Sequence, residues 1–373
     1  MKIRSIILLS CCLLLLGACQ IQATPAQVEE PIRSATVEAV EVATNTPLPP
    51  TATLLPALPT SAASATTAPS PTLTFTVAPS ATPDVYQELT IDWLTERSYG
   101  GGELQIQEVL ADNSYFTRYL ITYPSDGLTI YGFMNVPKRD QPPYPVVIAL
   151  HGYIDPAIYT TLDYTTGNAD ALARSGFLVI HPNLRGYPPS QEGDNLFRVG
   201  MAIDVLNLIA IVEAQGGSAG PLELAIPGSI GLWGHSMGGG ITTRVITINP
   251  RIRAAVLYGA MSGDEHQNYK AIYAWSEGER GNQELAVPEE ELGRISPIYY
   301  LPRISAAVSI HHGEADNLVP LAWSLDTCAR LTELGKIVEC YTYPGQPHTF
   351  HDEGEALFNE RVIDFFNLWL RDN

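Results

Sequence analysis

Nine short apolar segments, separated by turn residues, run through the second part of the chain. The first three alternate apolar and polar residues, which predicts antiparallel strands with one exposed face. The fourth, "PVVIALHG", is continuously apolar, as expected of a parallel strand buried on both faces. The predicted strands span 104–110, 115–124, 128–137, 145–152, 177–183, 229–234, 253–260, 306–313 and 336–344.

Predicted helices alternate with the later strands. They span 169–175, 196–213, a segment beginning near 237, 321–334 and 355–370. This alternation predicts an α/β fold with a mostly parallel central sheet, antiparallel amino-terminal strands and helices on both faces. The segment 261–302 is more polar and interrupts the alternation, so we expect it to form a small cap insertion.

The amino-terminal residues 1–19 have the pattern of an export signal. Lys2 and Arg4 precede an apolar run over 6–16, which is short for a membrane span. The run ends in "LGAC", which resembles a bacterial lipobox and predicts lipidation of Cys19. An ordinary cleaved signal peptide is the alternative. We therefore expect an exported protein, held by a lipid anchor at the cell envelope or cell surface.

Residues 20–85 are rich in threonine, proline, alanine and serine. Such a segment lacks the apolar residues that a packed core requires, so we expect a disordered stalk. Whether it carries O-linked sugars stays open. The folded domain is then predicted over 86–373.

The net charge limits the classes of partner, and the cysteines indicate a possible disulfide. The formal net charge is −19, which argues against nucleic acid or anionic lipid as an electrostatic partner. Two cysteines, Cys328 and Cys340, lie in the predicted domain. In an exported protein they can form a disulfide, and two buried thiols are the alternative.

The stretch "GHSMG" places Ser236 between a predicted strand and a predicted helix. This is the G-x-S-x-G nucleophile elbow, a sharp turn that exposes a serine hydroxyl above the carboxyl ends of the strands. A glycine-rich turn with a helix-capping serine is the alternative.

A serine needs a base, and the base needs an orienting acid. Asp316 follows the strand 306–313, and His348 follows the strand 336–344, so both are expected at the same sheet edge as Ser236. We therefore predict Asp316 as the orienting acid and His348 as the general base. The other residues considered are expected to be loop, strand-end or packing residues: Glu314, His351, His311, His312 and His235.

Acyl transfer also requires donors for the oxyanion. We expect the backbone N–H of Met237, the residue after the nucleophile, and that of Tyr153, in the loop after the strand 145–152. No spaced set of histidines, cysteines and carboxylates suggests a metal site, and we expect no cofactor.

The motifs "SDGLTIYGFMNVP", "PVVIALHG", "NLRGYPPS", "GLWGHSMGGG", "HGEADNLVP" and "YPGQPHTF" resemble those of α/β-hydrolases over about 119–370. Within that superfamily the chain resembles the prolyl oligopeptidase catalytic domain and dienelactone-hydrolase-like serine esterases. The resemblance implies the same roles for Ser236, Asp316 and His348, and a cap over the site. One departure is Asn183, where many relatives carry an acidic residue that would support the Arg185 loop.

The sequence thus predicts an exported serine hydrolase that cleaves carboxylic esters through an acyl-serine. The peptidases of the family usually carry a large propeller, and the region before the predicted domain is a stalk plus a few strands, which favours the esterase. A peptidase acting on short peptides stays the alternative, and a stalked binding module without catalysis is a remote one. The expected partners are a small ester or short peptide and the membrane, and the oligomeric state stays open.

Overall fold

The computed structural model describes residues 84–371. The predicted leader, Cys19 and almost all of the predicted stalk lie outside the described residues. None of the helices in 84–371 combines the length and the apolar character needed to cross a membrane.

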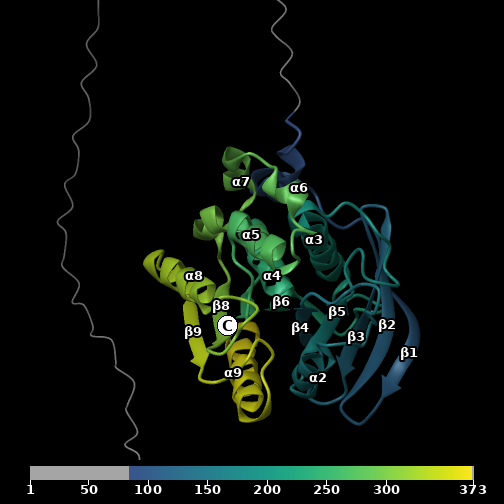
Figure 1. Cartoon of the computed structure of the whole chain (residues 1–373). Coiled ribbons are helices and arrows are strands. Elements are labelled where there is room, and N and C mark those ends of the chain that lie inside the picture. The colour runs from purple at the N-terminus through teal and green to yellow at the C-terminus, as the bar shows by residue number, and fades with distance from the viewer. Residues whose placement is uncertain (1–83, 372–373) are drawn as a thin grey trace, which may run out of the picture. The chain divides into compact units, whose positions relative to one another are not determined.

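One twisted sheet of nine strands organises the described residues (Figure 1). Its spatial order is β1-β2-β3-β5-β4-β6-β7-β8-β9. The pairs β1–β2, β2–β3 and β3–β5 are antiparallel, and every pair from β5–β4 to β8–β9 in this order is parallel. The predicted mostly parallel sheet with antiparallel amino-terminal strands is confirmed. The strands are β1 (Gln105–Asp112), β2 (Phe116–Ser125), β3 (Leu128–Pro137), β4 (Tyr144–Leu150), β5 (Leu178–Pro182), β6 (Ala225–His235), β7 (Ala254–Tyr258), β8 (Ala307–Gly313) and β9 (Val338–Tyr343).

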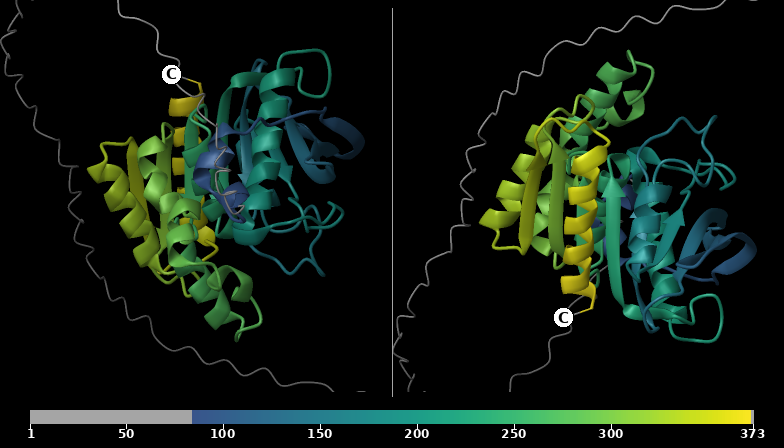
Figure 2. Two further views of the ribbon diagram at one scale, coloured as in Figure 1. Left: turned by 90° about the horizontal axis from the view of Figure 1, so that it is seen from above. Right: turned by 90° about the horizontal axis from the view of Figure 1, so that it is seen from below.

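Helices cover both faces of this sheet. Two apolar clusters form the core: α2 and α9 pack on one face, and α1, α3, α4 and α8 on the other. Figure 2 shows α9, in yellow, in front of the sheet in the view from below. The helices are α1 (Ile91–Glu96), α2 (Thr166–Arg174), α3 (Val199–Gln215), α4 (Met237–Ile248), α5 (Glu265–Trp275), α6 (Asn282–Leu285), α7 (Glu289–Ile295), α8 (Leu321–Glu333) and α9 (Asp352–Leu370).

The helix predicted from residue 196 begins later than expected. A 3-10 turn, η2 (Leu196–Arg198), precedes α3. Phe197 and Arg198 have φ angles of 54° and 58°, and this left-handed backbone is uncommon for residues other than glycine. The α-helix can therefore start only at Val199.

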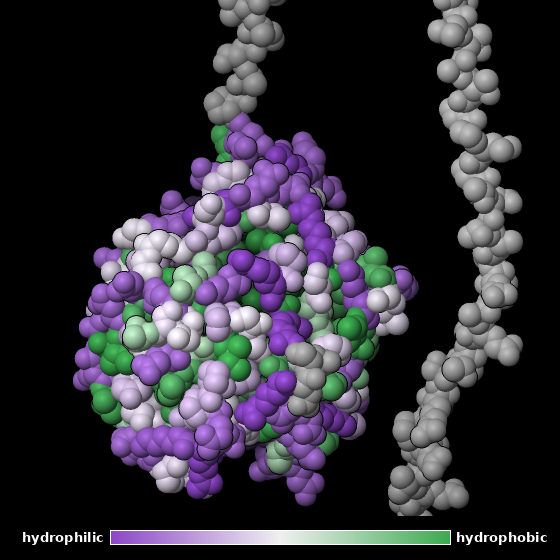
Figure 3. Space-filling view, turned by 180° about the vertical axis from the view of Figure 1, so that it is seen from behind, coloured by the Kyte–Doolittle hydropathy of each residue, from purple (hydrophilic) through white to green (hydrophobic). Residues whose placement is uncertain are grey.

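The segment 261–302, which the hydrophobic pattern left without assigned elements, contains the short helices α5, α6 and α7, and the 3-10 helix η3 (Pro297–Arg303) follows from Pro297. Their buried side chains are few, which explains the weak periodicity of this segment. On the face of the molecule shown in Figure 3, hydrophilic and hydrophobic residues are interspersed.

Candidate active site

Ser236 occupies the turn between β6 and α4, at a backbone conformation of φ 55° and ψ −114°. This conformation is costly for a residue with a Cβ, and such strain is concentrated at functional sites. The surrounding backbone maintains it. The Ser236 N–H donates to the Tyr258 carbonyl (2.9 Å), and the Ser236 carbonyl accepts from the N–H of Met261 (3.0 Å).

The two flanking glycines are required by close packing. A Cβ at Gly234 would lie 2.4 Å from the carbonyl oxygen of Gly238. A Cβ at Gly238 would lie 2.2 Å from the carbonyl oxygen of Leu150, in β4. Both distances are too short for any real Cβ, so a turn this tight accepts only glycine at the two positions.

Asp316 and His348 come together, as the sequence predicts. Asp316 follows β8, His348 follows β9, and His348 Nδ1 lies 2.7 Å from Asp316 Oδ2. The other carboxylate oxygen of Asp316 accepts the backbone N–H groups of Leu318 (2.8 Å) and Val319 (2.9 Å). The carboxylate therefore orients the imidazole ring from a fixed position.

Sequence reasoning missed the contribution of His312. Its Nε2 lies 3.2 Å from Asp316 Oδ2, and its Nδ1 lies 2.7 Å from Ser324 Oγ in α8. Burial raises the pKa of Asp316, but the hydrogen bonds from His312 and His348 outweigh it and hold that pKa well below its usual range. The strand pattern alone could not separate His312 from its neighbour His311, whose ring instead contacts Phe358 in α9.

His235, next to the nucleophile, packs beneath the elbow, as expected. Its Nε2 lies 2.9 Å from the His348 carbonyl oxygen, and its Nδ1 lies 2.6 Å from the hydroxyl of Tyr164. Burial, together with the neighbouring His348, lowers the pKa of His235 to about 3. The ring is therefore neutral near pH 7: Nε2–H donates to His348, and Nδ1 accepts from Tyr164.

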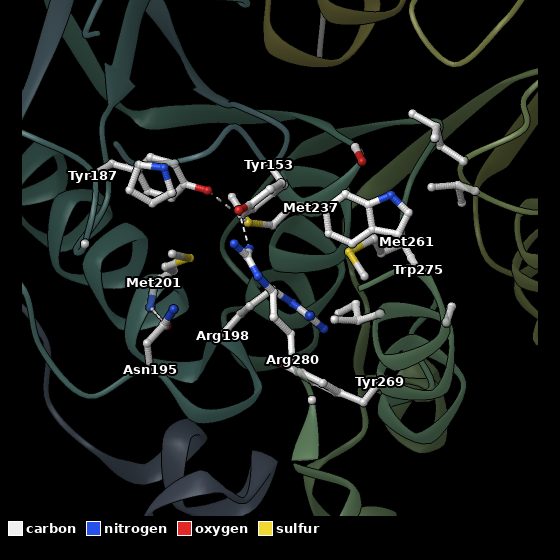
Figure 4. A pocket seen from close by; sticks show the side chains of 18 of the residues that line it. Tyr153, Tyr187, Asn195, Arg198, Met201, Met237, Met261, Tyr269, Trp275 and Arg280 are labelled. Carbon is white, nitrogen blue, oxygen red and sulfur yellow. Dashed lines mark hydrogen bonds between the residues drawn. The ribbon is translucent and has the colours of Figure 1, made fainter. Parts of the chain in front are cut away.

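Ser236 and His348 line the same cavity, which has a volume of about 740 Å³ (Figure 4). Ser236 Oγ forms no hydrogen bond among the described residues, so the structure brings Ser236 and His348 to one cavity but does not join them by a hydrogen bond. One wall of the cavity comes from the segment expected to be a cap, through Met261, Tyr269, Ile272, Trp275 and Arg280.

The two predicted oxyanion donors come from two segments, the turn that carries Ser236 and the loop after β4. A Cβ on Gly152 would lie 3.2 Å from Ser236 Cβ, so the loop after β4 passes directly beside the serine. Tyr153 follows in this loop, and Met237 follows Ser236. Within 84–371, the N–H groups of Tyr153 and Met237 have no hydrogen-bond acceptor in the protein.

The competing residues lie apart from this arrangement. Glu314 accepts a hydrogen bond from Thr342, and the exposed His351 pairs with Asp352. Neither Glu314 nor His351 lines the cavity. No group of three or more histidines, cysteines or carboxylates in the described part of the chain is arranged to hold a metal ion.

The Arg185 loop is stabilised by hydrogen bonds to Asp204, a residue that the sequence analysis did not single out. Asp204 in α3 accepts hydrogen bonds from the Arg185 guanidinium and from the Arg185 backbone N–H. Asn183 instead uses its amide group to bind Thr161 and the carbonyl of Pro188. The acidic partner thus comes from a helix rather than from position 183.

Cys328 in α8 and Cys340 in β9 form a disulfide in the structure, with their Cα atoms 6.4 Å apart. The bond links the helix before β9 to the strand itself, close in sequence to the loop that carries His348.

Comparison with known proteins agrees with this architecture. Residues 145–280 match the model of the alpha/beta hydrolase fold, and residues 222–373 match that of the prolyl oligopeptidase family. Acetyl xylan esterase 1 from Thermoanaerobacterium sp. JW/SL YS485 has a similar structure, with a TM-score of 0.56 and 19% identity. That similarity covers 76% of this chain and 93% of the esterase.

Peptidases are also similar, over a smaller share of their own length. The puromycin-hydrolyzing peptidase of Mycobacterium tuberculosis has a TM-score of 0.53 and 21% identity, over 70% of this chain and 41% of that one. The uncharacterized peptidase YuxL of Bacillus subtilis (strain 168) is 22% identical over 72% of this chain and 42% of its own length. The chain therefore spans less than half the length of these two peptidases. The chain has the α/β-hydrolase fold, and its carboxyl-terminal part matches the model of the prolyl oligopeptidase family.

Proposed function

We propose that the protein cleaves carboxylic esters through a covalent acyl-serine intermediate. His348 removes the proton from Ser236 Oγ as that oxygen attacks the ester carbonyl, and Asp316 stabilises the imidazolium that forms. The oxyanion receives hydrogen bonds from the N–H groups of Met237 and Tyr153. The imidazolium then protonates the leaving alcohol. A water molecule, deprotonated by His348, releases the acid.

One observation carries this proposal. The Asp316–His348 pair, joined at 2.7 Å, and the strained Ser236 lie at one edge of the sheet, and His348 and Ser236 line one cavity. The pair supplies an oriented base, and the cavity supplies room for an acyl group beside the serine. Small-molecule sites of this kind have volumes of about 300–1,000 Å³.

The choice of esters over peptides rests on the comparisons. The similarity to acetyl xylan esterase 1 extends over 93% of that enzyme, whereas the two peptidases are matched over 41% and 42% of their lengths. A peptidase acting on short peptides is the second candidate, favoured by the prolyl oligopeptidase match over 222–373.

Parallel assays with p-nitrophenyl acetate and with aminoacyl p-nitroanilides separate the two activities. Peptidases also hydrolyse activated esters, so the decisive measurement is turnover of the amide. We expect steady turnover of the ester and none of the amides above the Ser236→Ala background. Amide turnover comparable to that of the ester would establish the peptidase, and no turnover of either would favour a binding module.

We also propose that the enzyme is exported and anchored through a lipid on Cys19. The basic start, the apolar run and the "LGAC" sequence support this proposal. The Cys19→Ser variant is expected in the soluble fraction, whereas the wild-type chain is expected with membranes. A membrane fraction unchanged by the substitution would contradict the anchor.

A further inference from the structure

Three arginines line the cavity that contains Ser236. Arg185 is bound by Asp204, whereas Arg198 at the start of α3 and Arg280 in the cap are not held in this way (Figure 4). Arg198 precedes α3 and is 7% exposed. Arg280 lies between α5 and α6 and is exposed to solvent at the cavity. Both are separate from the residues that we propose for the chemistry of bond cleavage.

Arg198 keeps most of its hydrogen-bonding capacity unused. Its guanidinium donates to Glu265 through Nη2 and packs over the ring of Tyr269, with its Cζ 5.0 Å from the ring centroid. No other acceptor for this guanidinium is found in 84–371. A guanidinium has five N–H donors, and buried donors without partners are costly. Arg198 therefore has free donors where it borders the cavity.

Arg198 shares its ion-pair partner with another arginine. Glu265 pairs with Arg198 and also with Arg244, which is 1% exposed. Two buried guanidinium groups thus share one buried carboxylate, so Glu265 cannot occupy the remaining donors of Arg198.

Arg280 is held in place without a carboxylate. Its guanidinium donates to the Tyr153 hydroxyl, and its Cζ lies 4.8 Å from the centre of the Tyr153 ring. Within the described residues, no carboxylate oxygen lies within 4.0 Å of it. Because Tyr153 belongs to the loop that passes Ser236, this contact sets the second positive charge on the nucleophile's side of the cavity.

The acidic residues of the cavity wall do not bind these two groups directly. Glu192 and Glu284 also line the cavity, and Glu284 acts electrostatically on Arg198, but neither has a carboxylate oxygen within 4.0 Å of Arg198 or Arg280. Both guanidinium groups therefore present donors and positive charge to a ligand. A carboxylate, with two acceptor oxygens, fits the planar donor arrangement of arginine best.

We propose that the preferred substrates are esters bearing a free carboxylate, which Arg198 and Arg280 bind while Ser236 attacks the ester carbonyl. The proposal rests on the serine hydrolase function above and adds the class of substrate.

A matched pair of esters tests this assignment: p-nitrophenyl pentanoate, and the mono-p-nitrophenyl ester of glutaric acid. The acyl chains have the same number of carbons, and one ends in a methyl group where the other ends in a carboxylate. We expect wild-type kcat/KM to be about tenfold or more higher for the glutarate ester, as charge-assisted hydrogen bonds allow. In Arg280→Gln this ratio should fall at least severalfold, and Arg280→Lys should recover part of it.

The matched control is Arg251→Gln, which removes the same charge from an exposed arginine that pairs with Glu213 and does not line the cavity. It should leave the ratio unchanged. Hydrolysis of both esters by the wild type without preference for the glutarate ester, or a ratio that Arg280→Gln does not lower, would overturn the carboxylate assignment alone. Hydrolysis of neither ester would overturn the serine hydrolase function and this inference together.

Discussion

His312 Nε2 lies 3.2 Å from the same Asp316 oxygen that binds His348. Asp316, which orients the proposed base His348, therefore also contacts His312. The ring of His312 is fixed in turn by its hydrogen bond to Ser324 in α8. A carboxylate with this many donors has one favoured orientation. His348 is held in turn by His235, through its backbone carbonyl.

Replacing His312 should weaken catalysis without removing the nucleophile or the base. His312→Phe removes the Nε2–H group, which lies 3.0 Å from the Val319 carbonyl oxygen and 3.2 Å from the Asp316 carboxylate. A hydrogen bond to a charged group contributes about 1.5–3 kcal/mol, and the Asp316 contact is a shared one. We expect kcat to fall by about 10- to 100-fold. His312→Gln, which retains a donor, should recover part of the loss. Equal activity of His312→Phe and wild type, measured on protein with an unchanged melting temperature, would show that Asp316 needs no such support.

The proposed acid and base should each be necessary for turnover. His348→Ala removes the base, and Asp316→Asn keeps the shape but loses the charge that stabilises the imidazolium. Each is expected to lower kcat by several orders of magnitude, with about 10⁴-fold for Asp316→Asn. The control is Glu314→Gln, two residues from Asp316 and outside the cavity, which should retain wild-type kcat. If Glu314→Gln loses activity and Asp316→Asn does not, the acid has been misassigned.

Buried neutral histidines should make the protein less stable in weak acid. Burial lowers the pKa of His311 to about 3, whereas in the unfolded chain it is about 6.5. Between these values the unfolded state binds more protons, so the free energy of unfolding falls as the pH falls from about 6.5 toward 3. In His311→Phe this slope should be shallower by up to about 1.4 kcal/mol per pH unit.

Urea unfolding at pH 6.5, 6.0 and 5.5 measures this slope while staying above the range in which most carboxylates titrate. His266→Phe, at a position where the side chain is partly exposed, is a suitable control and should keep the wild-type slope. Parallel curves for wild type and His311→Phe would contradict a neutral buried His311.

The disulfide should stabilise the fold more than it affects catalysis. It closes a loop of 12 residues between α8 and β9, and loops of about this length contribute roughly 3 kcal/mol. The double substitution Cys328→Ser with Cys340→Ser should lower the free energy of unfolding by about 2–3 kcal/mol and leave kcat at 25 °C within about twofold. An unchanged melting temperature, in the presence or absence of reductant, would contradict this role.

The sequence predicts all nine strands because buried parallel strands and half-exposed antiparallel ones have distinct periodicities. It also predicts the meeting of Asp316 and His348, since each residue directly follows a parallel strand. It could not predict the cap helices, whose few buried residues give weak periodicity. The roles of His312 and Asp204 escaped it as well, because both depend on packing between elements distant in the fold rather than on a local pattern.

The central claim is that Ser236 is the nucleophile that forms the acyl-enzyme. Reaction with a fluorophosphonate probe, followed by mass spectrometry of the labelled peptide, tests it most directly. The account predicts one phosphonylated residue, Ser236, no label on Ser236→Ala, and greatly slowed labelling of His348→Ala. Absence of label on the folded wild-type protein, or equal labelling of Ser236→Ala, would contradict it.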